Sequence, residues 1–226
     1  MGGQACVLYG AAEFSRDTDL AILASPDNLD AFRTALDELQ ATCIAVPPFD
    51  RRFLEMGLAL HFRCQHPGAQ DMRIDVMSKM RGVDDFDVLW ERRTTLETLE
   101  GTVDAMALPD LVQAKKTQRD KDWPMLARLV ETNYFAHRAA PSPEQVRFWL
   151  CELRTPVLLI EAAAGQPVAA AGLAARRPLL EYALSGDEAA LRSALRAEED
   201  AEREADREYW VPLRAVLERL RHGAEA

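Results

Sequence analysis

The sequence predicts an α/β (α+β) domain with a mixed sheet, followed by an all-α domain. Strand-like and helix-like segments mix from residue 1 to about residue 135. The stretch Arg-Ala-Ala-Pro-Ser-Pro at residues 138–143 is typical of a domain boundary. Beyond it the chain is rich in Ala, Leu, Glu and Arg, without strand alternation. We therefore expect domains at residues 1–137 and 141–226.

Composition and charge limit the class of protein. The chain has 226 residues, 48% of them hydrophobic and 28% charged, which is typical of a water-soluble globular protein. No run approaches the ~20 apolar residues that span a bilayer, and the first residues do not resemble an export signal. Four scattered cysteines without a CxxC motif predict reduced thiols. We expect a cytoplasmic protein with no membrane association.

The elements follow from apolar periodicity. Residues 6–9 form a short apolar segment. Strand character recurs at residues 20–23, 58–64, 72–77 and 103–108, with a turn at 66–68. Helical spacing or a helix-starting proline predicts helices at residues 27–39, 109–119 and 123–134. About four more follow residue 143, the last over residues 188–221. Within it, residues 198–208 carry dense charge of both signs, which indicates a solvated helix with i,i+4 pairs.

Two carboxylates stand two residues apart directly before an apolar segment. Asp17 and Asp19 precede residues 20–23, and in a strand residues two apart point to the same side. Carboxylates held together repel each other unless a cation lies between them, and hard oxygen ligands favour Mg²⁺ or Mn²⁺. The pair therefore predicts a metal site at the end of a core strand, with a chance surface pair as the alternative.

A third acid has a matching setting. In the segment 72–77, Arg73, Asp75 and Met77 share one face, while Ile74 and Val76 face the other. A carboxylate amid a buried strand is costly unless it is paired or bound to metal. An ion pair with Arg73 is the alternative explanation. Three acids from two strands are what a two-metal phosphoryl transfer requires.

These motifs together resemble a known superfamily. Residues 2–10, Gly-Gly-Gln-Ala-Cys-Val-Leu-Tyr-Gly, and the Asp-Thr-Asp-Leu at 17–20 resemble the signature of the nucleotidyltransferase superfamily. The resemblance is closer to the branch that contains AbiEii-type toxins and many uncharacterised bacterial proteins. In that branch a Gly-Gly is followed by a helix, a polar loop and a strand carrying Asp-x-Asp. The resemblance covers roughly residues 2–130 and implies the nucleotidyltransferase fold for the first domain.

The resemblance also implies residue roles. Gly2 and Gly3 would let the backbone approach a triphosphate, Asp17 and Asp19 would bind Mg²⁺ or Mn²⁺, and Asp75 would be the third acid. A frayed Met-Gly-Gly terminus is the rival interpretation of the glycines. In the family an apolar strand runs directly into the Gly-Gly, whereas here only Met1 precedes it. Either the chain begins late, or this protein does without that strand.

A second stretch is similar to the same family. Residues 108–123 contain Asp-Leu, then Lys-Lys, then Arg-Asp-Lys-Asp, and related proteins carry a similar element. By resemblance, Lys115 or Lys116 would contact phosphates together with Arg119, and Asp122 would position a basic residue or cap the next helix. On a helix Lys115 and Arg119 are i,i+4 neighbours that could reach one anion. The choice between the lysines stays open, and an ordinary basic helix end is the alternative.

The expected function is transfer of a nucleoside monophosphate from an NTP to a hydroxyl acceptor, with release of pyrophosphate. The acceptor could be an RNA end, a protein or a small molecule. A net charge of −10 suits a cationic small molecule slightly better than tRNA. The resemblance to AbiEii-type toxins also raises an antitoxin as partner. The alternative is a non-catalytic nucleotide-binding, antitoxin-like partner protein; the presence of all three acids favours the enzyme.

Zinc is a further alternative for one segment. His61, Cys64 and His66 are three potential zinc ligands within six residues, but their spacing is not that of a closed site and no second pair follows. We interpret them as strand and turn residues.

Overall fold

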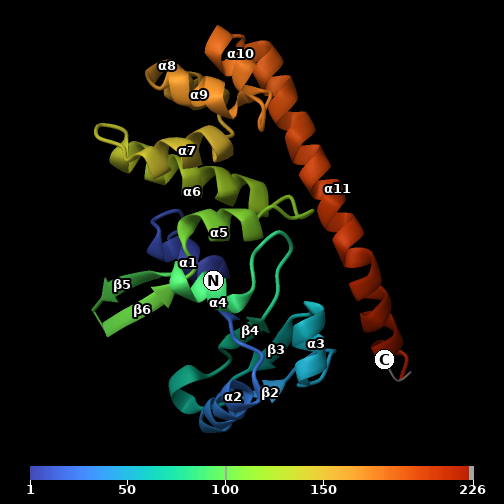
Figure 1. Ribbon diagram of the computed structural model, residues 1–226. Helices are drawn as coiled ribbons and strands as arrows, with labels where there is room; N and C mark the ends of the chain where they lie inside the picture. Colours follow the sequence, from blue (N-terminus) through green and yellow to red (C-terminus); the bar gives the residue numbers. More distant parts are fainter. Residues whose placement is uncertain (100, 224–226) are drawn as a thin grey trace. The chain divides into compact units, whose positions relative to one another are not determined.

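The protein has an α+β fold with a mixed four-stranded sheet and a helical C-terminal region, as expected (Figure 1). The computed structural model describes residues 1–99 and 101–223, so the last three residues of the expected helical domain lie outside it. The chain forms two compact units. The first unit comprises Met1–Ala114 and Arg207–Ala226, and the second unit comprises Lys115–Asp206. The expected boundary at residues 138–143 falls inside the second unit.

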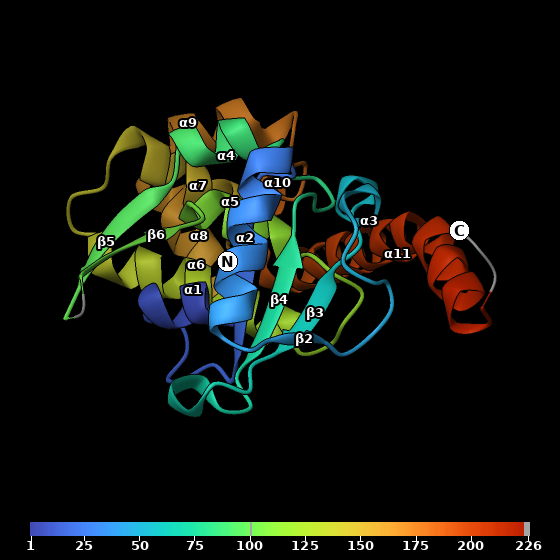
Figure 2. The same ribbon diagram turned by 90° about the horizontal axis from the view of Figure 1, so that it is seen from below.

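The sheet of the first unit has the spatial order β1-β4-β3-β2, of which Figure 2 labels β4, β3 and β2. Its strands are β1 (Asp17–Ala21), β4 (Arg73–Met77), β3 (Leu60–Arg63) and β2 (Thr42–Cys43). β1 pairs with β4 in parallel, whereas β3 is antiparallel to both β4 and β2. The strands expected at 58–64 and 72–77 are therefore present, joined through the short 3-10 helix Pro67–Ala69 at the expected turn.

The two faces of this sheet differ in chemistry. Ile74 and Val76 of β4 are buried, as are Leu60 and Phe62 of β3, and they belong to one hydrophobic core. Three helices add residues to that core: α2 (Pro26–Glu38), α3 (Arg51–Met56) and the C-terminal part of α11 (Glu188–Arg221). The alternate residues Arg73, Asp75 and Met77 lie on the opposite face, as the sequence predicted. Packing on one side therefore leaves the other side for polar groups.

Local signals set the helices on the core face. Ser25 caps α2 by accepting a hydrogen bond from the Asn28 N–H, and Pro26 occupies the first turn. Leu29 and Leu36 then bury one stripe of the helix. Asp50 caps α3, and Gly57 ends it with a φ of 90°, a value that L-residues rarely adopt. The sequence did not reveal α3, because six residues show too little periodicity.

Several expected bounds in the first unit were wrong. Residues 6–9 do not stand apart as a short apolar segment but largely belong to helix α1 (Gly2–Leu8). β1 begins at Asp17 and ends at Ala21, and none of its residues is fully buried, so the strand expected at 20–23 is earlier and less buried than predicted. The strand expected at 103–108 is β6 (Gly101–Ala105), which forms a hairpin with β5 (Thr94–Thr98). Helix α4 (Phe86–Glu91) precedes that hairpin and was not predicted.

The helix expected to run to Arg119 ends early. Helix α5 spans Leu108–Ala114, and residues 115–121 form a loop before α6 (Asp122–His137). In this loop the Thr117 N–H donates to the Lys115 carbonyl, and the Trp123 indole N–H donates to the Thr117 carbonyl. These bonds take the place of the helical ones. Lys115 and Arg119 are therefore not neighbours on one helix.

The second unit is helical throughout. After α6 come α7 (Pro143–Glu152), α8 (Pro156–Gly165), α9 (Pro167–Ala174), α10 (Leu180–Ser185) and the N-terminal part of α11. Prolines in the first turn and a Ser142–Gln145 capping box mark the starts. Tyr134 of α6 packs edge-on against Trp149 of α7, so residues 138–143 connect two packed helices. The long helix expected over residues 188–221 is confirmed as α11.

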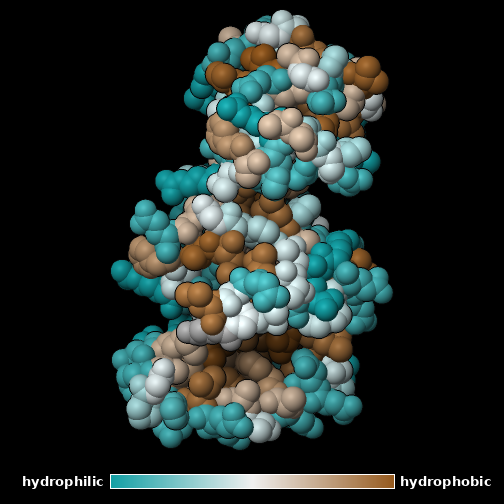
Figure 3. Space-filling model, turned by 90° about the vertical axis from the view of Figure 1, so that its left-hand side faces the viewer, coloured by the Kyte–Doolittle hydropathy of each residue, from teal (hydrophilic) through white to brown (hydrophobic). Residues whose placement is uncertain are grey.

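Among residues 1–99 and 101–223, no single helix has the length and apolar character to cross a membrane; α8 and α9 meet that test only as a pair bent by 112°. On the face in Figure 3, hydrophobic residues form small patches between hydrophilic ones.

The last part of α11 belongs to the core of the first unit, and this can be tested. Leu213 is buried, so Leu213→Ala should destabilise that unit by about 2–5 kcal/mol. Val211 on the same helix is 62% exposed, so Val211→Ala should cost about 0.5 kcal/mol or less. Native-state hydrogen exchange of the β3 and β4 amides measures both. Unchanged exchange in Leu213→Ala would show that this helix does not support the sheet.

Candidate functional site

The three predicted acids lie together on two neighbouring strands. In the parallel register of β1 and β4, Asp19 is directly opposite Asp75, and Asp17 is directly opposite Arg73. Asp75 is on the sheet face opposite the core, and paired residues of neighbouring strands share a face. Asp17 and Asp19 are two residues apart and are therefore on that face too. We call this surface, formed by Asp17, Asp19, Asp75, Arg73 and His61, the acid face.

The Gly-Gly segment contacts the acid face directly. The Gly3 N–H donates to Asp19 Oδ2 at 3.0 Å, and the amino group of Met1 donates to the Asp19 carbonyl at 2.8 Å. Gly2 has a φ of 60°, and a Cβ at this position would lie 2.0 Å from Asp19 Oδ2. Only glycine fits there, because a side chain would clash with the carboxylate and would also be strained. The resemblance placed glycines beside the Asp-x-Asp, and in this fold they touch Asp19.

The polar loop before β1 is tied to helix α1. A Cβ on Gly3 would come within 2.3 Å of Ser15 Oγ, so a side chain here would displace the Ser15 hydroxyl. Ser15 Oγ donates to the Asp17 carbonyl at 3.0 Å, and the Gln4 side chain donates to the Ser15 carbonyl at 3.3 Å. These contacts fix where β1 begins, and thus where Asp17 and Asp19 lie.

Two further residues of the acid face carry charge or protons. Arg73 Nε donates to Asp75 Oδ1 at 2.8 Å, and His61 Nδ1 is also 2.8 Å from this oxygen. Arg73 Nη2 lies 3.2 Å from His61 Nδ1, but Nδ1 carries either a proton or a lone pair and cannot serve both neighbours. The shorter contact makes it a donor to Asp75. From the sequence we considered His61 only as a zinc ligand, although its position between Leu60 and Phe62 could have placed it on the polar side of β3.

The charges on this face shift two pKa values. Burial raises the pKa of Asp75, but the hydrogen bonds and charges of His61 and Arg73 outweigh it, so the net pKa is lower than usual. The hydrogen bond from Arg73 to Asp75 raises the pKa of the guanidinium, burial opposes this, and the charges of Asp75, Asp17 and Asp19 add to the increase. Arg73 is therefore a permanent counter-charge among three carboxylates.

The ligand types on the acid face are those that a hard divalent cation prefers. Three carboxylates supply oxygen ligands of the type that Mg²⁺ and Mn²⁺ prefer. Oδ1 of Asp75 is taken by Arg73 and His61, whereas Oδ2 has no partner among the described residues. Within the same described ranges, no three His, Cys, Asp or Glu side chains are gathered into a ligand cluster. The residue types fit a metal, and Arg73 neutralises part of their charge without one.

The predicted phosphate-contacting cations lie in the second unit, in loop 115–121. Arg119 Nε donates to Asp122 Oδ2 at 2.6 Å, and Lys115 Nζ lies 3.7 Å from Asp122 Oδ1. Asp122 thus holds a basic residue, which is one of its two expected roles. Lys116 is buried, and its Nζ is 2.9 Å from Glu152 Oε2. The two lysines are therefore distinct: one shares Asp122 with Arg119, and the other forms a buried ion pair.

The residues weighed for zinc have separate surroundings. His61 bonds Asp75, whereas His66 Nδ1 accepts a hydrogen bond from the Gly68 N–H at 3.1 Å. Cys64 is buried, and burial raises the pKa of its thiol. His61 lies in a strand and His66 caps the turn, as the sequence suggested.

The lowered pKa of Asp75 predicts a pH effect. The ionised carboxylate stabilises the metal-free fold above the unfolded pKa of about 3.9, and this contribution is lost as the pH falls through the lower folded pKa. Arg73→Gln should raise the pKa of Asp75, so that the stabilising contribution of its carboxylate is lost at a higher pH. Arg63→Gln, an exposed change on β3, is the control. Carboxyl ¹³C NMR titration in EDTA measures the pKa; an equal increase in both variants would contradict the assigned ion pair.

Comparisons with known proteins do not place the chain in a family. No protein-family model matches it, and no match is found among curated proteins or solved structures. Function must therefore be inferred from the residues of this chain and the geometry between them.

Proposed function

We propose that the first unit is a nucleotidyltransferase that uses Mg²⁺ or Mn²⁺ to transfer a nucleoside monophosphate from an NTP to a hydroxyl acceptor. One observation carries the proposal. Asp19 and Asp75 are opposite each other on the polar face of the sheet, with Asp17 two residues away and the Gly3 N–H on Asp19. Carboxylates on adjacent strands beside a glycine backbone suit a polyanion bound through a cation.

In this reaction the acceptor oxygen bonds to the α-phosphorus and its proton passes to solvent water, while the bond from that phosphorus to the bridging oxygen breaks and pyrophosphate leaves with the electron pair. Asp17, Asp19 and Asp75 would hold the cations, which when bound would neutralise phosphate charge. Asp75 is held by His61 and Arg73, which lower its pKa further below neutral pH. A lowered pKa makes it a weak base, so its role is mainly to orient the hydroxyl.

The glycines and the loop cations have proposed roles in phosphate contact. Gly2 and Gly3 leave room for a phosphate to approach the backbone, although the Gly3 N–H is engaged with Asp19, so a phosphate would have to compete for it. For loop 115–121 we assign phosphate contact to Arg119 and Lys115. Lys116 is the weaker candidate, because it would have to leave its buried pair with Glu152.

One observation favours the rival function, a non-catalytic nucleotide-binding, antitoxin-like partner protein. Arg73 already compensates Asp75 and interacts with the charges of Asp17 and Asp19. An acid face that carries its own counter-charge can persist without metal and without chemistry. The two candidate proteins differ in one respect. Both would bind nucleotide, but only the enzyme would transfer a nucleoside monophosphate. The class of acceptor follows from the same transfer experiment.

The metal role of the acids predicts a ligand-dependent gain in stability. An NTP with Mg²⁺ at a hundred times its dissociation constant should add about 2.7 kcal/mol to the free energy of unfolding, because only the folded state assembles the site. Asp17→Asn with Asp19→Asn should abolish this gain and leave the metal-free protein at least as stable, since repulsion is removed. The matched control, Asp27→Asn with Asp37→Asn, changes two exposed acids of α2. A full melting shift in the acid-face variant would refute the metal assignment.

Transfer itself is tested by incubation with each α-labelled NTP, Mg²⁺, and total cell RNA or lysate. The proposal expects label on one class of acceptor from the wild-type protein, and none from Asp17→Asn with Asp19→Asn. A melting shift without any transferred label would instead support the non-catalytic nucleotide-binding protein.

A further inference from the structure

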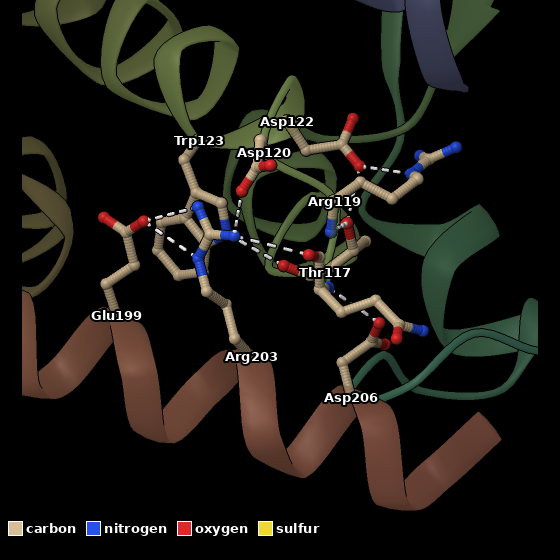
Figure 4. Close-up of polar contacts among 9 residues, drawn as sticks. Thr117, Arg119, Asp120, Asp122, Trp123, Glu199, Arg203 and Asp206 are labelled. Carbon is tan, nitrogen blue, oxygen red and sulfur yellow. Dashed lines mark hydrogen bonds and ion pairs between the residues drawn. The ribbon is translucent and has the colours of Figure 1, made fainter. Parts of the chain in front are cut away.

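Helix α11 holds loop 115–121 by both backbone polar groups of one residue, the N–H and the carbonyl of Gln118 (Figure 4). Asp206 Oδ2 accepts from the Gln118 N–H at 2.9 Å, and Arg203 Nη1 donates to the Gln118 carbonyl at 3.3 Å. The same Nη1 also donates to Asp120 Oδ1 at 2.6 Å. Asp206 is only 2% exposed, although it lies in a run of charges expected to be solvated. We call Arg203 and Asp206 the α11 clamp.

The clamp is itself supported. Glu199 accepts hydrogen bonds from Arg203 Nε at 2.9 Å and from Nη2 at 2.7 Å, an i,i+4 pair of the kind expected for this helix. The Arg203 guanidinium lies over the Trp123 ring, 5.5 Å from its centroid, and the Trp123 indole N–H donates to the Thr117 carbonyl at 2.8 Å. The backbone on either side of Gln118 is therefore fixed by two different helices.

The fixed loop presents Arg119 in one orientation. The buried Asp122 carboxylate accepts from Thr117 Oγ1 at 2.5 Å and from Arg119 Nε at 2.6 Å. The Arg119 side chain is nevertheless 57% exposed, and its terminal nitrogens have no partner among the described residues. In Figure 4 the end of the guanidinium points away from Asp122. An arginine held through Nε offers two terminal nitrogens, a fork that fits phosphate oxygens.

We propose that Asp206 and Arg203 are positioning residues for phosphate binding. By holding the backbone of Gln118, they fix the orientation of the next residue, Arg119. This inference rests on the phosphate role that the proposed function gives to Arg119. A loose loop would have to be ordered when an anion binds, and this ordering weakens binding. The clamp removes that cost beforehand. Asp206 itself is negative and would repel an anion, so its two effects have opposite signs.

Because loop ordering by Asp206 favours anion binding and its negative charge opposes it, removing Asp206 distinguishes the two effects. Inorganic tripolyphosphate is titrated into the full chain by calorimetry, without divalent cations. Asp206→Ala removes the acceptor and should raise the dissociation constant about tenfold, whereas the conservative Asp206→Asn keeps an acceptor oxygen and should stay within about threefold. Asp200→Ala removes an exposed carboxylate from the same helix and should leave binding unchanged or slightly tighter. If Asp206→Ala binds as tightly as the wild-type protein or more tightly, the inference is wrong.

A double-mutant cycle tests whether Asp206 acts through Arg119. Arg119→Ala should weaken tripolyphosphate binding, and Arg119→Ala with Asp206→Ala should bind no more weakly than Arg119→Ala alone. Losses that multiply would overturn the inference, and so would an Arg119→Ala variant that binds normally. The Asp17/Asp19 melting experiment uses other residues and a metal-bound NTP, so either claim can fail while the other stands.

Hydrogen exchange at one amide checks the clamp without any ligand. The Gln118 amide should exchange faster in Asp206→Ala than in the wild-type protein or Asp200→Ala, while the α6 amides stay protected, which shows that the unit is folded. Unchanged exchange at Gln118 would mean that Asp206 does not hold the loop.

Discussion

The parallel pairing of β1 with β4 is the constraint on which the candidate site depends. This register sets Asp19 opposite Asp75 and Asp17 opposite Arg73. Carboxylates at such positions repel each other, and the fold compensates with Arg73 and His61, which both bond Asp75. The acid face remains strongly acidic, and a divalent cation would compensate the negative charge that Arg73 leaves. His61 and Arg73 thus lower the pKa of Asp75, and the negative charge that they leave on the acid face is what the proposed cation would compensate.

Helix α11 has two different structural roles along its length. Its C-terminal part supplies Leu213 and Val216 to the core beneath the sheet of the first unit. Its preceding part contributes Arg203 and Asp206, which hold the Gln118 peptide of the second unit. Dense charge in a helix usually indicates a solvated surface, yet here Asp206 is buried and bonded to backbone. A charged helix can therefore organise a loop.

Sequence periodicity predicted what depends on neighbouring residues. The alternation in β4, the proline start and apolar stripe of α2, and the bounds of α11 are all local patterns, and all are present. The end of α5 could not be predicted, because Lys115–Arg119 are acceptable helix residues and Gln118 is held by a side chain 88 positions away. His61 was missed as a partner of Asp75 because that pairing follows from strand register. The acids themselves were found because Asp-x-Asp before an apolar segment is a local signal.

The most direct test of the central claim, that the acid face binds a divalent cation, is paramagnetic broadening of backbone amide NMR signals by substoichiometric Mn²⁺. We expect the amide signals of Gly3, Asp17, Asp19 and Asp75 to broaden first. In the variant Asp17→Asn with Asp19→Asn, these signals should no longer broaden before the others. Broadening that spares these amides while affecting other acidic surfaces would contradict it.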